Sequence, residues 1–501
     1  MAENIHVTNK TMELKDCRKD WFFSEKHGCW CLEDILYTHK ALAPKFQRLS
    51  IYVPAEYMKE NGEMNGEGKC GRYTSSTAPV ILQNNSAGYM QMPHLCLDGP
   101  RWNGKQFLDR GFVFVTCGNR GSESMDEKGN QCGKSPANLV DLKTVIRFLR
   151  HNQAVIPGDF NRLISIGTSA GGAMSSLLGL TGNHGDFVPY LEENGAFMEE
   201  RDDVYASQIY CPIVDLEHAD LAYEWMFSAD KENEASHAGP AGVMTPFGEA
   251  LSAKLSQRYI NYFNSLGVVN PENGEPLRIG EDGRSGSAYE YLMNLLNKSA
   301  TLYLNRLIAG ELEEQYSVED YLSEKDKRKW LSWDGEKAQI SGLDEYVLNY
   351  RRRMKPCTSF DTLGMDSGEN RVFGDIERPY MHFNSEIAEA IGELKEKAPE
   401  EYEKYYEAYR MADRDKELER RVYLFNPLNY IGKKDNADAA EHFRIRVGAY
   451  DADTSLTISM TLALKLAEAG ADIDYALVWD KPHCDADYPG EVCDWIEKIC
   501  N

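Results

Sequence analysis

Short apolar runs rich in β-branched residues alternate with amphipathic helical patterns over about the first 215 residues. The runs predict strands at 79–85, 111–121, 162–167 and 207–215. Residues 138–152 space their apolar side chains three and four apart, which predicts an amphipathic helix, and a further helix is expected over 173–180. Such alternation of strands and helices is typical of a mainly parallel sheet with helices on its faces.

The pattern changes after about residue 217, where a charged and helical stretch begins that continues to about residue 425. Strand and helix patterns then return, with strands expected at 443–450 and 472–480 and a helix at 454–471. Two strands hardly form a sheet alone, so three consecutive domains are the less favoured arrangement. We predict one α/β domain made of residues 1–216 and 426–501, interrupted by a helical insertion over 217–425.

The strand expected at 162–167 leads into Gly167-Thr168-Ser169-Ala170-Gly171, which fits the pattern G-x-S-x-G. This pattern is short and common, but here a strand precedes it and a helix follows at once, as a nucleophile elbow requires. A glycine-rich turn in another doubly wound fold is the alternative, since such turns use glycine for the same steric reason. With this context, Ser169 is the candidate nucleophile.

A nucleophilic serine needs a histidine base and an acid that orients it, in the chain order serine, acid, histidine. Among the histidines after Ser169, only His483 follows the last predicted strand, in the loop where such a base belongs. The acid should follow the preceding strand, which selects Asp451 or Asp453. Asp453 stands beside Thr454 and has an alternative role as a helix N-cap. We therefore assign Asp451 to the triad.

The negative charge that develops on a reacting carbonyl oxygen needs backbone N–H donors. The first donor is expected to be Ala170, at the start of the helix that follows the elbow. The second should come from the loop after the strand at 79–85, where Gly88 is our choice and Ala87 the neighbouring alternative. This chemistry requires no metal and no other cofactor.

Composition narrows the range of partners. Eighty acidic residues against 55 basic ones give the 501-residue chain a formal net charge of −25, which argues against nucleic acid and anionic membranes as partners.

The N-terminus lacks a secretory pattern, and no apolar run approaches the length of a membrane span. The 12 cysteines are dilute, and the pair Cys29 and Cys31 has no second pair at zinc spacing. We expect reduced thiols in a cytoplasmic protein.

Five short segments of the chain are distinctive in combination: NSAGYM after an early strand, GTSAGGAMS at the elbow, YRRRMKP in the insertion, and NPLNYI followed by DADTS near the end. Together they resemble the bacterial tannases, a family of α/β-hydrolase esterases that cleave esters of gallic acid. The elbow alone is shared with many esterases, whereas RRRMKP combined with DADTS is far more specific. The resemblance implies a doubly wound, mostly parallel α/β-hydrolase sheet with a large, mainly helical lid insertion.

The resemblance also implies residues that bind the hydroxyl groups of the gallate ring, namely Lys355 in RRMKP, Glu369 in DSGEN and Asp453 in DADTS. An ammonium and two carboxylates are chemically suited to three adjacent ring hydroxyls. Spacing alone favours reading Lys355 and Glu369 as ordinary surface charges. Asp361 and Asp366 lie close in sequence and compete with Glu369 for its role.

The resulting hypothesis is a serine esterase that hydrolyses galloyl esters through an acyl-enzyme, with a small phenolic ester as its only expected partner. One alternative is a feruloyl or general carboxylesterase. Another is a catalytically inactive hydrolase fold used for binding. A surface hairpin is expected over 61–73, without an assigned role. The natural alcohol portion and the oligomeric state are not determined by the sequence.

Overall fold

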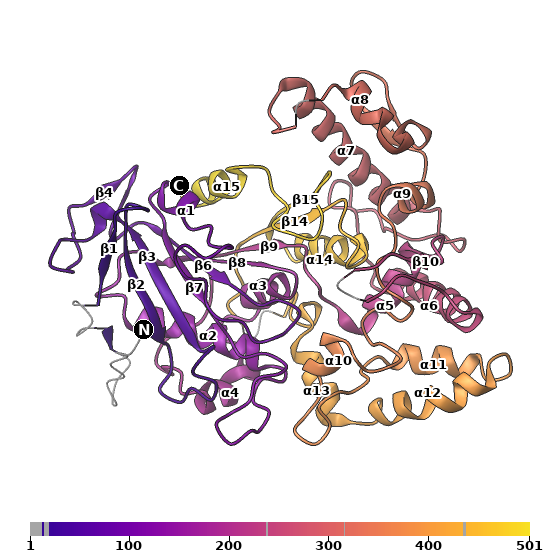
Figure 1. Ribbon diagram of the computed structural model, residues 1–501, viewed down its shortest axis with the longest axis horizontal. Helices are drawn as coiled ribbons and strands as arrows, with labels where there is room; N and C mark the ends of the chain where they lie inside the picture. Colours follow the sequence, from indigo (N-terminus) through magenta and orange to yellow (C-terminus); the bar gives the residue numbers. More distant parts are fainter. Residues whose placement is uncertain (1–12, 15–19, 237–238, 315, 434–436) are drawn as a thin grey trace.

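A computed structural model describes residues 13–14, 20–236, 239–314, 316–433 and 437–501. Most of residues 1–17, from which we expect the absence of a secretory signal, lies outside the described residues. Within the described ranges, the chain forms one large sheet, three two-stranded sheets and many helices (Figure 1).

The large sheet contains nine strands in the order β1-β2-β3-β7-β6-β8-β9-β14-β15. In chain order its strands are β1 (Phe22–Ser24), β2 (Cys29–Leu36), β3 (Arg48–Pro54), β6 (Pro79–Asn84), β7 (Val113–Cys117), β8 (Asp159–Thr168), β9 (Ala206–Tyr210), β14 (His442–Gly448) and β15 (Asp472–Val478). Neighbours from β7 to β15 run parallel, and β1, β2, β3 and β7 pair antiparallel at one edge. The expected doubly wound, mostly parallel sheet is confirmed.

The helices outside the insertion precede, connect or follow the strands of the large sheet. They are α1 (Lys105–Leu108), α2 (Ala137–His151), α3 (Ala170–Leu180), α4 (Val188–Glu193), α14 (Leu456–Glu468) and α15 (Glu491–Ile499), with 3₁₀ turns η2 (Ala55–Tyr57), η3 (Gly185–Phe187) and η5 (Pro427–Asn429). The helices predicted over 138–152 and 454–471 are therefore present within three residues of the expected ends. The strand predicted to reach residue 215 ends at Tyr210, because Cys211 and Asp215 have positive φ angles of 40° and 51° that an extended strand excludes.

Strands from both sides of the insertion belong to one sheet. β14 pairs with β9, and β15 pairs with β14, so the late strands extend the sheet that the early ones begin (Figure 1). None of the described residues between α5 and η5 joins this sheet. The division into residues 1–216 and 426–501 on one side and 217–425 on the other remains a prediction.

The insertion is mainly helical, as expected. Its helices are α5 (Leu216–Met226), α6 (Pro246–Ser265), α7 (Ser287–Ala309), α8 (Val318–Ser323), the 3₁₀ turn η4 (Glu324–Lys329), α9 (Leu343–Asn349), α10 (Gly368–Val372), α11 (Ser385–Glu393), α12 (Pro399–Ala412) and α13 (Lys416–Leu424). Two small hairpins interrupt them, β10 (Glu232–Asn233) with β11 (Gly242–Val243) and β12 (Leu331–Trp333) with β13 (Ala338–Ile340). Figure 1 shows the labelled helices of the insertion on the side of the molecule away from the antiparallel edge of the sheet.

The surface segment at 61–73 forms a hairpin only at its end, where β4 (Lys69–Cys70) pairs with β5 (Tyr73–Thr74). Each of these strands has two residues, so the hairpin carries little independent structure. It lies at the antiparallel edge of the sheet, opposite the insertion (Figure 1).

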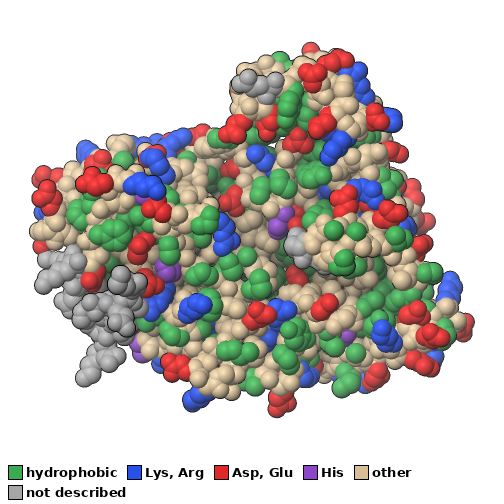
Figure 2. Space-filling view, in the orientation of Figure 1, with side chains coloured by type: hydrophobic (Ala, Val, Ile, Leu, Met, Phe, Trp, Pro, Cys, Tyr) green, Lys and Arg blue, Asp and Glu red, His purple; other side chains and the backbone are tan. Residues whose placement is uncertain are grey.

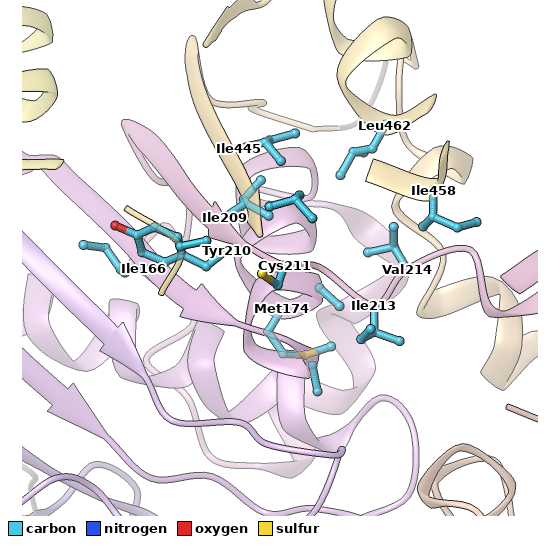
Figure 3. Packing of buried hydrophobic residues seen from close by; sticks show 14 of the residues in the cluster. Ile166, Met174, Ile209, Tyr210, Cys211, Ile213, Val214, Ile445, Ile458 and Leu462 are labelled. Carbon is cyan, nitrogen blue, oxygen red and sulfur yellow. The ribbon is translucent and has the colours of Figure 1, made fainter. Parts of the chain in front are cut away.

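A continuous apolar core lies beneath the carboxyl ends of the parallel strands. Figure 3 shows side chains of β8, α3, β9, β14 and α14 meeting around Cys211. Ile209, Ile445 and Leu462 in this group are completely buried, as is Cys211 itself. Burial of such side chains stabilises the sheet by about 1.5–3 kcal/mol each, so the strand ends that carry the candidate site are held rigidly.

Acidic and basic side chains are interspersed over the face of the molecule in Figure 2, in keeping with a solvated acidic surface.

Across the described ranges, no helix combines the length and apolarity that crossing a bilayer requires. All cysteines in these ranges are free thiols. The cytoplasmic location remains a prediction.

Candidate active site

The candidate nucleophile stands on a strained turn between β8 and α3. Ser169 has φ 63° and ψ −123°, a conformation that costs a non-glycine residue about 1–3 kcal/mol. Its backbone N–H donates to the carbonyl of Tyr210 on the neighbouring strand over 3.0 Å, which holds the turn. α3 starts at the next residue, so the expected helix begins three residues earlier than predicted and follows the serine directly.

Steric crowding explains the glycines around Ser169. A Cβ atom on Gly167 would lie 2.3 Å from both Asn84 Nδ2 and the carbonyl oxygen of Gly171. On Gly171 it would lie 2.7 Å from Asn84 Oδ1, and on Gly172 2.5 Å from the Tyr210 carbonyl oxygen. The expected role of the glycines in close strand–helix packing thus has a geometric basis.

Asn84 is a residue of the elbow that the sequence analysis missed. Its amide Nδ2 contacts three acceptors, the carbonyls of Ile166 and Gly171 at 3.1 and 3.0 Å and Ser175 Oγ at 3.0 Å. This side chain therefore joins the end of β6 to both arms of the elbow. The only signal in the sequence is a polar residue that ends an apolar strand.

The candidate acid and base lie in contact at the ends of adjacent strands. His483 Nδ1 and Asp451 Oδ2 are 2.8 Å apart, and Asp451 Oδ1 accepts the backbone N–H of Asp453 over 2.8 Å. The Asp451 side chain is fully buried, whereas that of His483 is 21% exposed. This is the arrangement in which a carboxylate fixes the orientation of a general base.

Charges around His483 increase its proton affinity. Burial disfavours the imidazolium, but the charge and hydrogen bond of Asp451, together with the charge of Asp453, outweigh burial and raise the pKa of His483 above its ordinary value. Asp453 Oδ2 lies 3.8 Å from His483 Nδ1. The charge of Lys355 acts on the same ring in the opposite direction.

Two contacts hold the loop of His483, one against the elbow and one against the end of β9. The hydroxyl of Thr168, the residue before Ser169, donates to the carboxylate of Asp485. The thiol of Cys211, which follows Tyr210, lies 3.3 Å from the carbonyl oxygen of Cys484. The first contact joins the loops of the candidate nucleophile and the candidate base, and the second joins the loop of the candidate base to the end of β9. Neither contact was foreseen from the sequence.

The loop proposed to supply the second oxyanion donor packs on the elbow. Ala87 and Met90 form an isolated β-bridge that turns through Gly88, which has φ 55°. The carbonyl oxygen of Ser86 is 3.0 Å from the Cβ position of Gly171. Ala170 stands at the first position of α3. The geometry leaves both Gly88 and Ala87 as candidates for the second donor.

The three residues predicted to bind a phenolic ring, Lys355, Glu369 and Asp453, are charged residues whose charges influence one another. Lys355 is buried, with its Nζ 3.9 Å from the centre of the Phe360 ring. Burial raises the pKa of Glu369, the charge of Lys355 opposes this effect, and the charge of Asp453 adds to it. Since Asp453 also adjoins His483, this group borders the acid–base pair.

The insertion reaches the oxyanion loop at α10, which carries Glu369. A Cβ atom on Gly368 would lie 2.8 Å from the carbonyl oxygen of Gly88. The surface-charge interpretation of Lys355 and Glu369 is therefore disfavoured, because both side chains lie where the insertion meets the sheet.

The two competing aspartates are engaged elsewhere. Asp361 is completely buried, and its carboxylate accepts from Asn370 Nδ2 and from the backbone N–H groups of Phe383 and Asn384, and contacts His382 Nδ1. Asp366 is exposed and accepts from the Thr362 hydroxyl over 2.7 Å. Glu369 thus keeps its predicted role ahead of both.

One set of potential metal ligands overlaps the acid–base pair. Cys211, Asp451 and His483 have ligand atoms within 4.8 Å of one another. Two of these residues already use those atoms in the Asp451–His483 hydrogen bond. The sequence-based expectation of a mechanism without metal stays a prediction.

The fold and the site define the class of the protein. A mostly parallel sheet with a serine at a strained strand-to-helix turn, followed in the chain by a buried aspartate and a histidine, is the arrangement of α/β-hydrolase enzymes. The sequence model of the family described as BD-FAE matches residues 78–234. The chain is a carboxylic ester hydrolase.

Solved structures identify the family. The native tannin acyl hydrolase of Lactobacillus plantarum is 33% identical, with a TM-score of 0.80 over 94% of each chain. The tannase of Fusobacterium nucleatum is 31% identical, with a TM-score of 0.77 over 94% of this chain and 95% of the other. A tannin acyl hydrolase in complex with ethyl gallate is 32% identical, with a TM-score of 0.78 over 94% of each chain. The chain belongs to the bacterial tannase family.

Curated protein sequences contain no match to this chain. The assignment to the family therefore rests on the solved structures, whose identity and coverage extend through both the sheet and the insertion.

The raised pKa of His483 predicts the pH dependence of the reaction. A general base must be neutral, so kcat/KM should fall as pH decreases through the pKa of His483 in the free enzyme. We expect the midpoint of this acidic limb above the ordinary value of 6.5. Asp453→Asn, assayed on methyl benzoate, should move the midpoint to lower pH. A midpoint at or below 6.5, or one unmoved in the variant, would contradict the assignment.

Crowding at the elbow predicts the effect of one added methyl group. Gly167→Ala should lower the free energy of unfolding by about 1–3 kcal/mol, because the methyl group has no space beside Asn84 and Gly171. Denaturant unfolding measures this, with Gly185→Ala as the matched control, since a Cβ there has no neighbour within 4 Å. Equal stability of the two variants would show that the elbow relaxes freely.

Proposed function

We propose that the protein is a serine esterase that hydrolyses galloyl esters to gallic acid and an alcohol through an acyl-enzyme. The observation that carries this proposal is the position of Lys355, Glu369 and Asp453. An ammonium and two carboxylates form one electrostatic group beside the Asp451–His483 pair. A 32% identical relative in complex with ethyl gallate supports the same substrate class.

The proposed reaction proceeds in two acyl-transfer steps. The Ser169 hydroxyl attacks the ester carbonyl and transfers its proton to His483 Nε2, while Asp451 accepts from Nδ1–H. The oxyanion of the tetrahedral intermediate accepts hydrogen bonds from the backbone N–H groups of Ala170 and Gly88. When the intermediate collapses, the C–O bond to the alcohol breaks and His483 returns the proton to the leaving oxygen. Water activated by the same base then releases the acid from Ser169.

Ring recognition is proposed to involve both signs of charge. Each phenolic hydroxyl is a donor and an acceptor, so carboxylates of Glu369 and Asp453 accept from the ring while the Lys355 ammonium donates to it. A ring without hydroxyls forms none of these hydrogen bonds with the three charged groups, and this loss creates selectivity. A feruloyl ester has one ring hydroxyl and one methoxy group in place of three hydroxyls, and a CH=CH unit separates its ring from the ester carbonyl, so it should be a poorer substrate.

The insertion over residues 217–425 is proposed to act as a lid on the site. It supplies Lys355 and Glu369, while the sheet supplies Ser169, Asp451 and His483. The close approach of Gly368 to Gly88 supports this division of roles.

Removing the nucleophile provides the first test. Ser169→Ala should reduce kcat on methyl gallate by about 10⁴-fold or more, as in other triads. Ser176→Ala is the matched control, because that buried hydroxyl bonds to the Gly172 and Ala173 carbonyls within α3. The intact mass of the wild-type protein during turnover should increase by one galloyl group. Near-normal activity of Ser169→Ala would remove this residue from its role.

Removing ring-binding groups provides the second test. Lys355→Ala, Glu369→Ala and Asp453→Ala should each lower kcat/KM for methyl gallate by about 10- to 100-fold more than for methyl benzoate. These assays should be run at a pH above the acidic limb of the kcat/KM profile. His483 is then neutral in every variant, so the effect of Asp453 on its pKa does not contribute.

Asp366→Ala is the control for this series, since it removes an exposed carboxylate from the turn just before α10, the helix that carries Glu369. Methyl ferulate, assayed in parallel, separates the galloyl esterase from a feruloyl esterase. Equal losses on gallate and benzoate in the three ring variants would leave a plain carboxylesterase.

A further inference from the structure

The hydroxyl of Tyr223 joins two segments that are far apart in the sequence. Tyr223 is completely buried on α5, the first helix of the insertion (Figure 1). Its hydroxyl donates to the carbonyl of Ala452 over 3.1 Å. The same oxygen accepts the backbone N–H groups of Met354 and Lys355 over 3.0 and 3.1 Å.

These hydrogen bonds use the full capacity of one phenol. Burial raises the pKa of Tyr223 to about 12, so the hydroxyl remains protonated at neutral pH. A neutral phenol has one donor, which Ala452 takes, and oxygen lone pairs for the two N–H groups. The backbone at Lys355 is therefore fixed relative to the turn 451–453 by a single atom.

Both segments carry residues with proposed functions. Ala452 stands between Asp451, which orients His483, and Asp453, which is proposed to bind the ring together with Lys355. A shift of Lys355 relative to this turn would change the spacing of the two ring-binding groups. Hydrogen-bonded binding sites tolerate little displacement of this kind.

Other residues on the same face of α5 hold the segment that follows Lys355. Asp220 accepts three successive backbone N–H groups, those of Ser359, Phe360 and Asp361, over 2.6, 2.9 and 3.0 Å. The Phe360 ring positioned in this way lies against Lys355 Nζ at 3.9 Å.

The residue after Tyr223 holds the segment that precedes Lys355. Glu224 pairs with the buried Arg353, whose guanidinium also donates to the carbonyl of Lys355 over 3.1 Å. One helix face thus contacts the chain before, at and after Lys355.

We propose that Tyr223, assisted by Asp220, is a positioning residue for substrate selection, which sets the distance between Lys355 and Asp453 and so matches the site to a hydroxylated ring. This proposal rests on the proposed function. In this proposal, the Tyr223 hydroxyl acts through the backbone groups of Ala452, Met354 and Lys355.

Tyr223→Phe tests the proposal by removing one oxygen atom. The ratio of kcat/KM for methyl gallate to that for methyl benzoate should fall about tenfold, because Lys355 and Ala452 lose their common partner. The loss on methyl gallate should fall mainly on KM. Tyr57→Phe is the matched control, since that buried hydroxyl also bonds to a backbone carbonyl, of Gly111, over 2.7 Å at the far edge of the sheet. Its ratio should equal that of the wild type.

A purely structural role predicts a different result. In that case, Tyr223→Phe would lower the thermal unfolding temperature and the activity on both esters alike, and an unchanged ratio would overturn the proposal. If Tyr223→Phe fails to fold, Asp220→Asn, which weakens the hold on residues 359–361, should lower the same ratio. A normal ratio in a folded Asp220→Asn protein would then count against the proposal.

A double variant separates this proposal from the proposed function. If Tyr223 acts through Lys355, then adding Tyr223→Phe to Lys355→Ala should change the ratio less than twofold. A further tenfold loss in the double variant would contradict positioning through Lys355. If Lys355→Ala itself leaves the ratio unchanged, the ring-binding function fails, whereas a selective Lys355→Ala beside a non-selective Tyr223→Phe overturns only the positioning role.

Discussion

The hydrogen bond between Asp451 and His483 depends on the register of two parallel strands. Gly448 at the end of β14 pairs with Val478 at the end of β15, so the turns that follow leave the sheet at the same level. A Cβ on Gly448 would lie 2.1 Å from the carbonyl oxygen of Lys481, which shows how closely the second turn folds over the first. Parallel strands place their carboxyl ends at one edge, and β8 brings Ser169 to that same edge. The chemistry of the site is thus a consequence of sheet geometry.

Selectivity has a different structural origin from the chemistry. The groups proposed to bind the ring come from the insertion and from the turn after β14, and α5 connects the two through Tyr223. A buried polar group that lacks a hydrogen-bond partner lowers the stability of the fold. The arrangement of the segments in which all of these hydrogen bonds form is therefore more favourable than its alternatives. An insertion that varies in sequence can therefore change the acyl group accepted without altering the strand ends.

The pattern of apolar residues in the sequence was sufficient to predict most strands of the parallel part of the sheet. β6, β8, β14 and β15 lie within three residues of the predicted ranges. β6 and β8 contain near-continuous apolar runs, as buried parallel strands do, whereas β14 alternates apolar residues with Arg444 and Arg446. The antiparallel strands β1 to β3 were not assigned, and the strand at β9 was predicted too long, since the backbone bends at Cys211 for reasons that its side chain does not encode.

The candidate site shows the same division between local and distant information. Ser169 and His483 are marked by local patterns, a G-x-S-x-G turn and a loop after the last strand. Asn84 and Tyr223 carry no such mark, because their function lies in contacts with residues distant in the chain, such as the bond from Tyr223 to Ala452. Contacts of this kind become visible only when the fold brings the segments together.

On the proposed function, Asp453 links recognition of the ring to the proton affinity of the base. Its carboxylate lies 3.8 Å from His483 Nδ1 and raises the pKa of that ring, and the same charge raises the pKa of Glu369. Lys355 opposes both effects. On the proposed function, the hydroxyl groups of a bound ring donate hydrogen bonds to the two carboxylates and accept one from the Lys355 ammonium, so the ring changes the electric field that acts on the base. Substrate recognition and proton transfer would then depend on the same three charged groups.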